Sequence, residues 1–124
     1  MKKLLLVEDD QFLSALLNNR LQKEGFEVRL AATGEEALAI LKIWKPDLIL
    51  LDLILPGKSG FEVMEEIRQD PALSRKAPIM ILSNLGQNSD IERAKSLGAV
   101  DYLVKARTSI NEVVMRVKSA LSND

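Results

Sequence analysis

The sequence lacks both cysteine and histidine among its 124 residues. Without cysteine the chain forms no disulfide and offers no thiolate nucleophile. Without histidine it has no imidazole base and no imidazole metal ligand, so any phosphohistidine in its chemistry must belong to another protein. Aromatic residues are also few, with one Trp, one Tyr and three Phe. Any chemistry therefore rests on carboxylates, hydroxyls and amines.

The sequence also has no surplus of either charge, because 17 basic residues stand against 18 acidic ones. This balance gives no indication of direct nucleic-acid binding. Its apolar stretches are far shorter than the roughly 20 residues that span a bilayer, so no membrane partner is expected. The N-terminus lacks the apolar region of a signal peptide. Hydrophobic residues make up 47% of the chain, which is enough for one domain with one core.

Strand-like and helix-like segments alternate five times along the chain. The predicted strands are residues 3–7, 27–30, 47–52, 79–82 and 100–104. The first, third and fourth are nearly continuous apolar runs, which is typical of strands buried on both faces. The second and fifth carry more polar residues and are expected nearer the edges. This alternation predicts a parallel sheet with right-handed crossovers.

Apolar residues at helical spacing fill the segments between the strands, and we expect each stripe to face the core. The stripes are Phe12, Leu13, Leu16, Leu17 and Leu21; Ala37, Leu38, Leu41 and Trp44; Phe61, Met64 and Ile67; Ile91, Ala94 and Leu97; and Ile110, Val113, Val114, Val117 and Leu121. Four helices are predicted to begin with a capping box, at Thr33, Ser59, Ser89 and Ser109, each three residues before a glutamate. Gly25 is predicted to close the first helix.

Polar side chains follow four of the predicted strands at the point where each strand ends. They are Glu8, Asp9 and Asp10, then Asp52, then Ser83, then Lys105. The carboxyl ends of parallel strands meet at one edge of a sheet, where open α/β sheets bind ligands. Carboxylate oxygens suit Mg²⁺, and an aspartate carboxylate can attack phosphorus to form an acyl phosphate. The hydroxyl and the amine would then bind phosphoryl oxygens.

Each of these residues also has a plainer interpretation. Asp10 can cap the first helix, Asp52 can be a turn residue, and Ser83 and Lys105 are common in loops and on surfaces. The combination favours a metal and phosphate site. There, Asp9, Asp52 and a backbone carbonyl would hold Mg²⁺, and Glu8 would hold a metal-bound water or support the ligands.

These residues occur in an order that closely resembles the receiver domain of two-component response regulators, over essentially the whole chain. The matching segments are residues 5–10 (LLVEDD), 47–57 (DLILLDLILPG), 59–62 (SGFE), 78–83 (PIMILS) and 98–105 (GAVDYLVK). The resemblance implies a flavodoxin-like α/β fold, (βα)5 and doubly wound, whose five-stranded parallel sheet has the order 2-1-3-4-5. It also implies a single receiver domain over residues 1–124.

The resemblance assigns the phosphoryl chemistry to particular residues. Asp52 is expected to accept a phosphoryl group from a phosphohistidine on a sensor histidine kinase or a phosphotransfer protein. Glu8 and Asp9 correspond to the acidic pair that holds Mg²⁺, or Mn²⁺, together with Asp52 and the backbone carbonyl of Ile54. Such a domain is a signalling module rather than an enzyme, although it promotes its own phosphorylation and dephosphorylation. Its expected location is the cytoplasm.

The resemblance also implies a switch and an output face. Lys105 is expected to bind the phosphate, Ser83 to move toward it, and Tyr102 to turn inward when Ser83 moves. The fourth helix, fifth strand and fifth helix would form the face that meets an unidentified target protein, or a second copy in a phosphorylation-dependent dimer. On that face helix periodicity favours burial of Val114, and Met115 is a candidate exposed residue. No output domain follows in this sequence, so we expect a stand-alone regulator or a receiver separated from its output domain.

Two positions depart from the family pattern. Ala106 follows Lys105 where proline usually follows through a cis bond, so this bond is either trans with a re-routed loop or cis at a cost of ~2.5–4 kcal/mol. Asn84 stands where a small residue usually follows the switch hydroxyl, which predicts an altered phosphoryl lifetime. The alternative function is a degenerate receiver that docks without phosphorylation. Two other families fit poorly. The chain lacks the phosphate-cradling loop of a flavodoxin, and it has Ile54 where a haloacid-dehalogenase-type phosphatase has its second aspartate.

Overall fold

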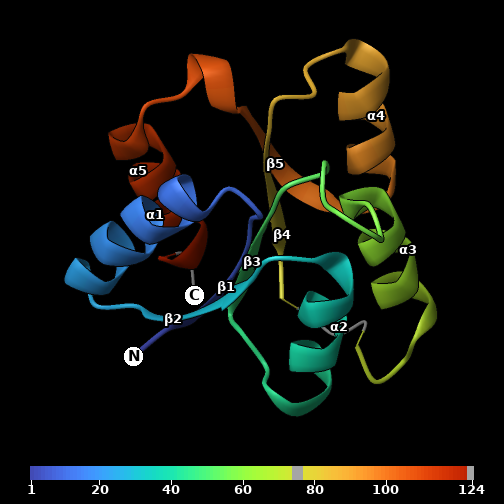
Figure 1. Ribbon diagram of the computed structural model, residues 1–124, viewed down its shortest axis with the longest axis horizontal. Helices are drawn as coiled ribbons and strands as arrows, with labels where there is room; N and C mark the ends of the chain where they lie inside the picture. The colour runs from blue at the N-terminus through green and yellow to red at the C-terminus, as the bar shows by residue number, and fades with distance from the viewer. Residues whose placement is uncertain (74–76, 123–124) are drawn as a thin grey trace.

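The protein folds around one parallel five-stranded sheet, seen in a computed structural model that describes residues 1–73 and 77–122 (Figure 1). The strands are β1 (Lys3–Val7), β2 (Glu27–Ala31), β3 (Leu48–Leu51), β4 (Ile79–Ser83) and β5 (Ala99–Val104). Their order in the sheet is β2-β1-β3-β4-β5, and all four neighbouring pairs run parallel. The predicted flavodoxin-like fold with the order 2-1-3-4-5 is therefore confirmed.

Helices cover both faces of this sheet. They are α1 (Gln11–Lys23), α2 (Gly34–Ile43), α3 (Gly60–Gln69), α4 (Asn88–Ser96) and α5 (Ile110–Leu121), with a short 3₁₀ helix η1 (Lys105–Arg107) before α5. Figure 1 shows α1 and α5 on one face and α2, α3 and α4 on the other. None of the helices in the described part of the chain is long and apolar enough to cross a membrane.

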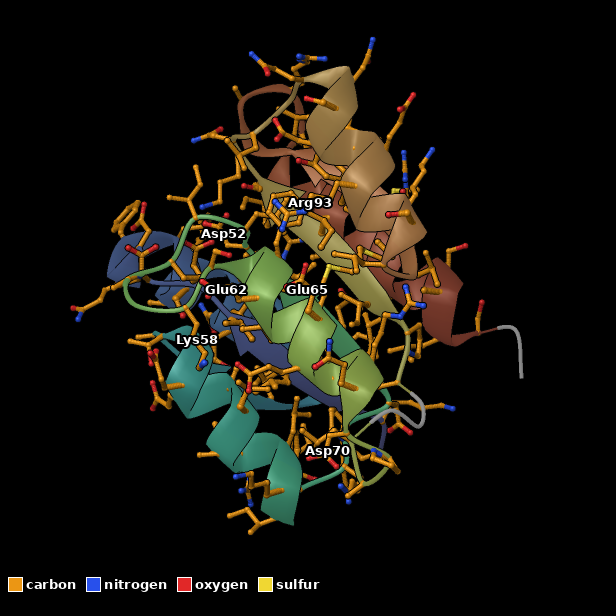
Figure 2. All side chains as sticks on the ribbon, turned by 90° about the vertical axis from the view of Figure 1, so that its right-hand side faces the viewer. Asp52, Lys58, Glu62, Glu65, Asp70 and Arg93 are labelled. Atoms are coloured by element: carbon orange, nitrogen blue, oxygen red, sulfur yellow. The ribbon has the colours of Figure 1, made fainter. Side chains whose placement is uncertain are left out.

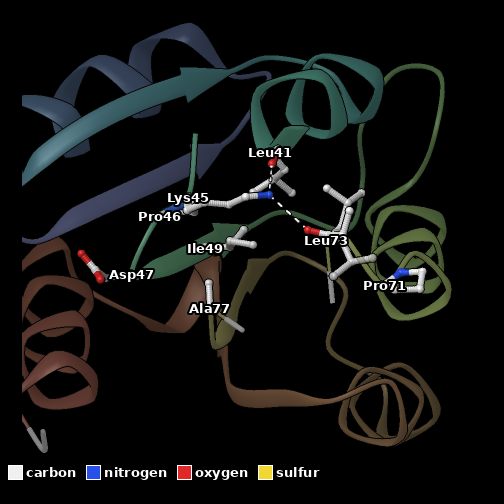
Figure 3. A pocket seen from close by; sticks show the side chains of 10 residues that line it. Leu41, Lys45, Pro46, Asp47, Ile49, Pro71, Leu73 and Ala77 are labelled. Atoms are coloured by element: carbon white, nitrogen blue, oxygen red, sulfur yellow. Dashed lines mark hydrogen bonds between the residues drawn. The ribbon is translucent and has the colours of Figure 1, made fainter. Parts of the chain in front are cut away.

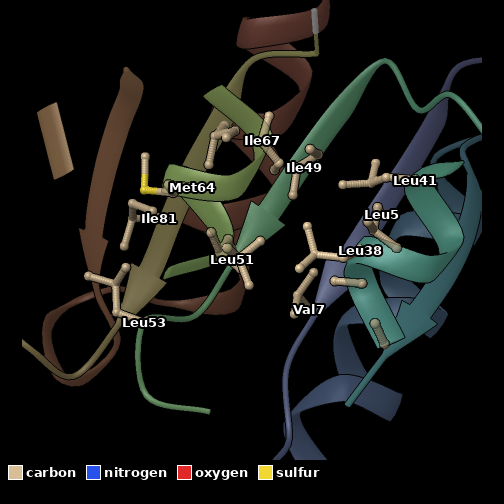
Figure 4. Close-up of a cluster of buried hydrophobic side chains, with 14 of the residues drawn as sticks. Leu5, Val7, Leu38, Leu41, Ile49, Leu51, Leu53, Met64, Ile67 and Ile81 are labelled. Carbon is tan, nitrogen blue, oxygen red and sulfur yellow. The ribbon is translucent and has the colours of Figure 1, made fainter. Parts of the chain in front are cut away.

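The central strands are buried on both sides and feed two separate cores, because successive side chains of a strand point to opposite faces. In β1, Leu4 and Leu6 pack with α1 and α5, whereas Leu5 and Val7 pack with α2 and α3. Figure 4 shows the second of these cores. All residues of β3 and β4 are buried, while β2 and β5 include exposed residues. The predicted central and edge strands are thus confirmed.

Side chains cap three helices at the predicted residues. Thr33, Ser59 and Ser109 each accept the backbone N–H of the residue three positions later. Within the described residues the complete reciprocal box is recorded at α3, where the Glu62 carboxylate also accepts the Ser59 N–H. Gly25, with a φ of 95°, follows α1 as predicted.

The predicted start of α4 at Ser89 is wrong. The helix begins at Asn88, and Gln87 is the N-cap with an extended backbone (φ −75°, ψ 151°). The Gln87 carbonyl already accepts the N–H groups of Asp90 and Ile91, so Ser89 lies inside the first turn. Gln87 makes no side-chain cap hydrogen bond, and α4 therefore starts without one.

The predicted core stripe of α1 is also partly wrong. Phe12 is 83% exposed and Leu16 is 40% exposed. The helix instead buries Ser14, Leu17 and Leu21, which lie on one face and leave the other two residues turned away from the sheet. In α5, burial of Val114 is confirmed and Met115 is exposed.

Candidate functional site

The acids that follow β1 and β3 lie side by side. These strands pair in register up to Val7 and Leu51, so the residues that come next leave the sheet at the same edge. One carboxylate oxygen from each of Glu8, Asp9 and Asp52 lies within 4.8 Å of the others. Glu8 and Asp52 are buried, whereas Asp9 is exposed. The cluster therefore has a buried floor and one acid open to solvent.

Lys105 reaches this cluster from the end of β5. Its Nζ lies 2.7 Å from Oδ2 of Asp52 and 2.9 Å from Oε1 of Glu8, and its side chain is 16% exposed. Burial lowers the pKa of the Lys105 ammonium, but the hydrogen bonds to Asp52 and Glu8 outweigh it, and the pKa lies above its usual value. The site thus holds a charged amine between two buried carboxylates.

Burial raises the pKa of the Glu8 carboxyl, and the charge of Asp52 acts in the same direction. The hydrogen bond from Lys105 and the N–H of Asp10, which lies 3.0 Å from Oε2 of Glu8, offset this only in part. Asp10 itself caps α1, where its Oδ1 accepts the N–H groups of Phe12 and Leu13. The plainer interpretation of Asp10, as the cap of the first helix, is thereby confirmed. In the cluster itself, the carboxylates of Glu8, Asp9 and Asp52 outnumber the ammonium of Lys105.

The loop after β3 fixes the orientation of Asp52. The Ile54 N–H donates to Oδ1 of Asp52 at 3.1 Å, which leaves Oδ2 to Lys105. Gly60, the first residue of α3, packs directly beneath this loop, because a Cβ there would lie 2.3 Å from the Asp52 carbonyl oxygen. The Gly60 N–H also donates to the Leu53 carbonyl at 3.0 Å. Any larger residue at Gly60 would displace the loop that carries Asp52.

The peptide bond between Lys105 and Ala106 is trans, because the described residues contain no cis peptide bond. The chain turns here through η1, and the Thr108 hydroxyl donates to the Val104 carbonyl at 2.7 Å. Of the two predicted arrangements, the trans bond with a different loop is the observed one. Lys105 reaches the acids without proline.

Ser83 and Tyr102 meet at a third residue, Leu85. Ser83 is fully buried at the end of β4, and its hydroxyl accepts the Leu85 N–H at 3.4 Å. The Tyr102 hydroxyl donates to the Leu85 carbonyl. Burial, followed by the charges of Asp90 and Asp52, raises the pKa of Tyr102 to about 12. The segment after β4 is therefore held by both candidate switch residues.

The structure brings together most of the residues that the sequence singled out. Glu8, Asp9, Asp52 and Lys105 form one cluster, whereas Ser83 and Tyr102 form a second group on the neighbouring strands. Sequence reasoning missed Gly60 and Leu85. The glycine at the start of a capped helix was an available signal for Gly60, but nothing in the sequence marks Leu85, which acts through its backbone.

A separate cavity of about 600 Å³ lies at the opposite edge of the sheet, before β3 and β4 (Figure 3). Its two charged lining residues already have partners. Lys45 donates to the carbonyls of Leu41 and Ala72, and Asp47 accepts the Lys3 N–H at 2.7 Å. We assign this cavity no part in the chemistry of the acid cluster.

Comparison with known sequences and structures points to one family. Residues 4–118 match the family model of the response regulator receiver domain. The phosphate regulon transcriptional regulatory protein PhoB of Rhizobium meliloti is 43% identical over 119 residues, which cover 96% of this chain and 52% of that protein. The transcriptional regulatory protein CpxR of Klebsiella pneumoniae is 40% identical over 98% of this chain and 50% of its own length. The chain thus spans about half the length of these relatives.

Solved structures agree with the sequence matches. A response regulator from Chloroflexus aurantiacus superposes with a TM-score of 0.87 at 37% identity, covering 98% of both chains. The Mn²⁺-bound form of the response regulator Rcp1 superposes with a TM-score of 0.86 at 32% identity, covering all of this chain and 97% of that one.

Proposed function

Since the chain belongs to the response regulator receiver domain family of two-component signal transduction, we propose that Asp52 is its phosphoacceptor. The observation that carries this proposal is the contact of Lys105 with both Asp52 and Glu8, beside the exposed Asp9. A buried carboxylate that has an amine at 2.7 Å and an opening to solvent has the surroundings that an acyl phosphate needs.

In the proposed reaction an oxygen of the Asp52 carboxylate attacks the phosphorus of a phosphohistidine on a partner. A P–O bond forms while the P–N bond breaks, and its electron pair returns to the imidazole of the partner. The Lys105 ammonium lies 2.7 Å from Oδ2 and stabilises the negative charge that the phosphoryl group brings. Attack of water on the phosphorus later restores Asp52 and releases phosphate.

The donor set fits a hard divalent cation. Glu8, Asp9 and Asp52 offer oxygens within 4.8 Å of one another, and carboxylate oxygens are what Mg²⁺ and Mn²⁺ prefer. We propose that Asp9 and Asp52 bind the ion directly, with the Ile54 carbonyl as a further ligand and Glu8 in support. Bound there, the cation would screen the repulsion between the carboxylate and the incoming phosphoryl group.

The switch part of the proposal concerns Ser83 and Tyr102. A phosphoryl group on Asp52 would attract the Ser83 hydroxyl away from the Leu85 N–H, which it accepts through a long hydrogen bond of 3.4 Å. Since the Tyr102 hydroxyl binds the carbonyl of the same Leu85, it would follow. The result is a population shift on the face formed by α4, β5 and α5.

The proposed partners follow from this scheme. The donor is a sensor histidine kinase or a phosphotransfer protein, because the chain has no histidine of its own. The output is an unidentified target protein, or a second copy of the chain bound after phosphorylation, with no direct contact to nucleic acid or membrane. We propose that the chain acts as one receiver unit, promotes its own phosphorylation and dephosphorylation, and works in the cytoplasm.

Intact mass after incubation with acetyl phosphate and Mg²⁺ tests the proposal. We expect the mass of one phosphoryl group to be added, and to be absent from Asp52→Ala and from samples with a chelator. Asp47→Ala is a matched control, because this aspartate lies before β3 rather than after it and should leave the addition unchanged. No addition in a folded protein, with beryllofluoride also failing to bind, would contradict the proposal and favour phosphorylation-independent docking.

A further inference from the structure

The fourth helix is held in place differently from its neighbours. Ala94 is the one buried residue of α4, all of whose residues are described. Its N-terminus has no side-chain cap. The helix packs on β5, and side-chain contacts with α3 add to what fixes its position. These contacts involve Phe61, Glu65 and Arg68 on α3 and Arg93 and Ser96 on α4, and we call this group the α3–α4 clamp.

Arg93 is the central residue of the clamp. Its guanidinium carbon lies 4.1 Å from the centre of the Phe61 ring, and Nη2 lies 3.4 Å from Oε2 of Glu65. Figure 2 labels Arg93 and Glu65 on the side of the molecule formed by α2, α3 and α4. Arg68 adds a second contact, because its Nη1 donates to the Ser96 carbonyl in the last turn of α4 at 2.8 Å. The two arginines thus join the C-terminal half of α4 to α3.

The Phe61 ring beneath Arg93 is fixed relative to the phosphoacceptor loop. Phe61 is buried and directly follows Gly60, which packs against the Asp52 carbonyl with no space for a Cβ. The same glycine donates its N–H to Leu53. A short path of direct contacts therefore runs from Asp52 through Gly60 and Phe61 to Arg93, without passing through Ser83 or Tyr102.

We propose that Arg93 is a positioning residue that opposes the phosphorylated arrangement by clamping α4 to α3. This inference rests on the proposed function, in which Ser83 moves toward a phosphoryl group on Asp52. Only residues 84–87 separate Ser83 from α4, so movement of Ser83 pulls on the start of that helix. A ligand that favours the moved arrangement must spend part of its binding free energy on breaking the clamp. Without the clamp that part is not lost, and the ligand binds more tightly.

Titration with beryllofluoride and Mg²⁺, followed by calorimetry, tests this proposal in the whole chain. Arg93→Ala should bind beryllofluoride about threefold to tenfold more tightly, the factor that corresponds to an exposed cation–π contact and a surface ion pair. Arg93→Lys keeps the charge but loses the planar stacking. Its affinity for beryllofluoride should lie between those of the original chain and Arg93→Ala. Lys95→Ala removes an exposed cation of the same helix and should match the original chain. An unchanged or weaker affinity in Arg93→Ala overturns the clamp.

A second measurement separates failure of the clamp from failure of the proposed function. If the original chain binds no beryllofluoride, the proposed function fails. The clamp is then judged by amide hydrogen exchange in the absence of ligand. Arg93→Ala should speed exchange in α4 while leaving α3 unchanged, and Lys95→Ala should change neither. Equal exchange in α4 of Arg93→Ala and the original chain would overturn the clamp on its own.

Discussion

Helices α3 and α4 are neighbours of nearly equal length, with ten and nine residues, yet the fold anchors them very differently. The first buries Gly60, Phe61, Val63, Met64 and Ile67 and begins with a complete capping box. The second, all of whose residues are described, buries Ala94 and begins at Asn88, after an N-cap residue, Gln87, that makes no side-chain cap hydrogen bond. The first helix is therefore anchored by five buried residues, whereas the second is anchored by Ala94, by its packing on β5 and by exposed side chains.

This difference matches the positions of the two helices relative to the site. Helix α3 follows the loop that carries Asp52, and α4 follows the segment that begins at Ser83. Chemistry needs groups held in fixed geometry, whereas signalling needs an element that can change position at low cost. Under the proposed function, the loop with Asp52 and α3 would stay in place, whereas Ser83 and α4 would respond.

The largest expected effect on stability comes from truncating a buried residue of each helix in turn, Met64 in α3 and Ala94 in α4. Met64→Ala should lower the free energy of unfolding by about 2–5 kcal/mol, since Met64 lies in α3 and is fully buried in the core. Ala94→Gly should lower it by about 1 kcal/mol. Urea unfolding followed by the fluorescence of Trp44, the only tryptophan, measures both. An equal loss in the two variants would remove the contrast between the helices.

A smaller effect is expected at the two N-caps. Ser59→Ala should destabilise the protein by about 1 kcal/mol, because the α3 box loses the hydroxyl that accepts the Glu62 N–H. Gln87→Ala should have almost no effect, while Gln87→Asp should stabilise the fold by supplying the missing cap. The same urea measurement serves here. If Gln87→Ala is as destabilising as Ser59→Ala, α4 is better anchored than the contacts indicate.

The smallest effect at neutral pH concerns Tyr102, the only tyrosine. Its pKa of about 12, raised mainly by burial, means that the phenol stays protonated well above the ordinary tyrosine value of about 10. The associated stability is fully present below pH ~10 and is lost as the pH rises through about 12. Phenolate absorbance measured against pH should show this midpoint. A midpoint near 10 would mean that the Tyr102 phenol is not buried beside Asp90 and Asp52 as in this structure.

The sequence was enough to predict what depends on the sheet itself. The apolar runs of β1, β3 and β4 indicated strands buried on both faces, and parallel pairing then brings the residues after them to one edge. Glu8, Asp9, Asp52 and Lys105 meet for that reason, far apart though they are along the chain.

Features that depend on how helices sit on the sheet were not predictable in the same way. Helix α1 carries apolar residues on more than one face, and periodicity alone did not show that Ser14 rather than Phe12 is buried. The contact of Arg93 with Phe61 joins two helices whose relative position no local pattern specifies. The sequence left the bond before Ala106 open between two arrangements, and the structure has it in the trans form that non-proline residues favour.

Amide hydrogen exchange with Mg²⁺, measured with and without beryllofluoride, tests the central claim most directly. In the free protein we predict faster exchange in α4 than in α3. On addition of beryllofluoride we predict changes concentrated in residues 83–104, with α3 unaffected apart from its first turn beside Asp52. Equal exchange in the two helices, or a response spread evenly over both, would contradict the division into a fixed acidic side and a responsive α4 side.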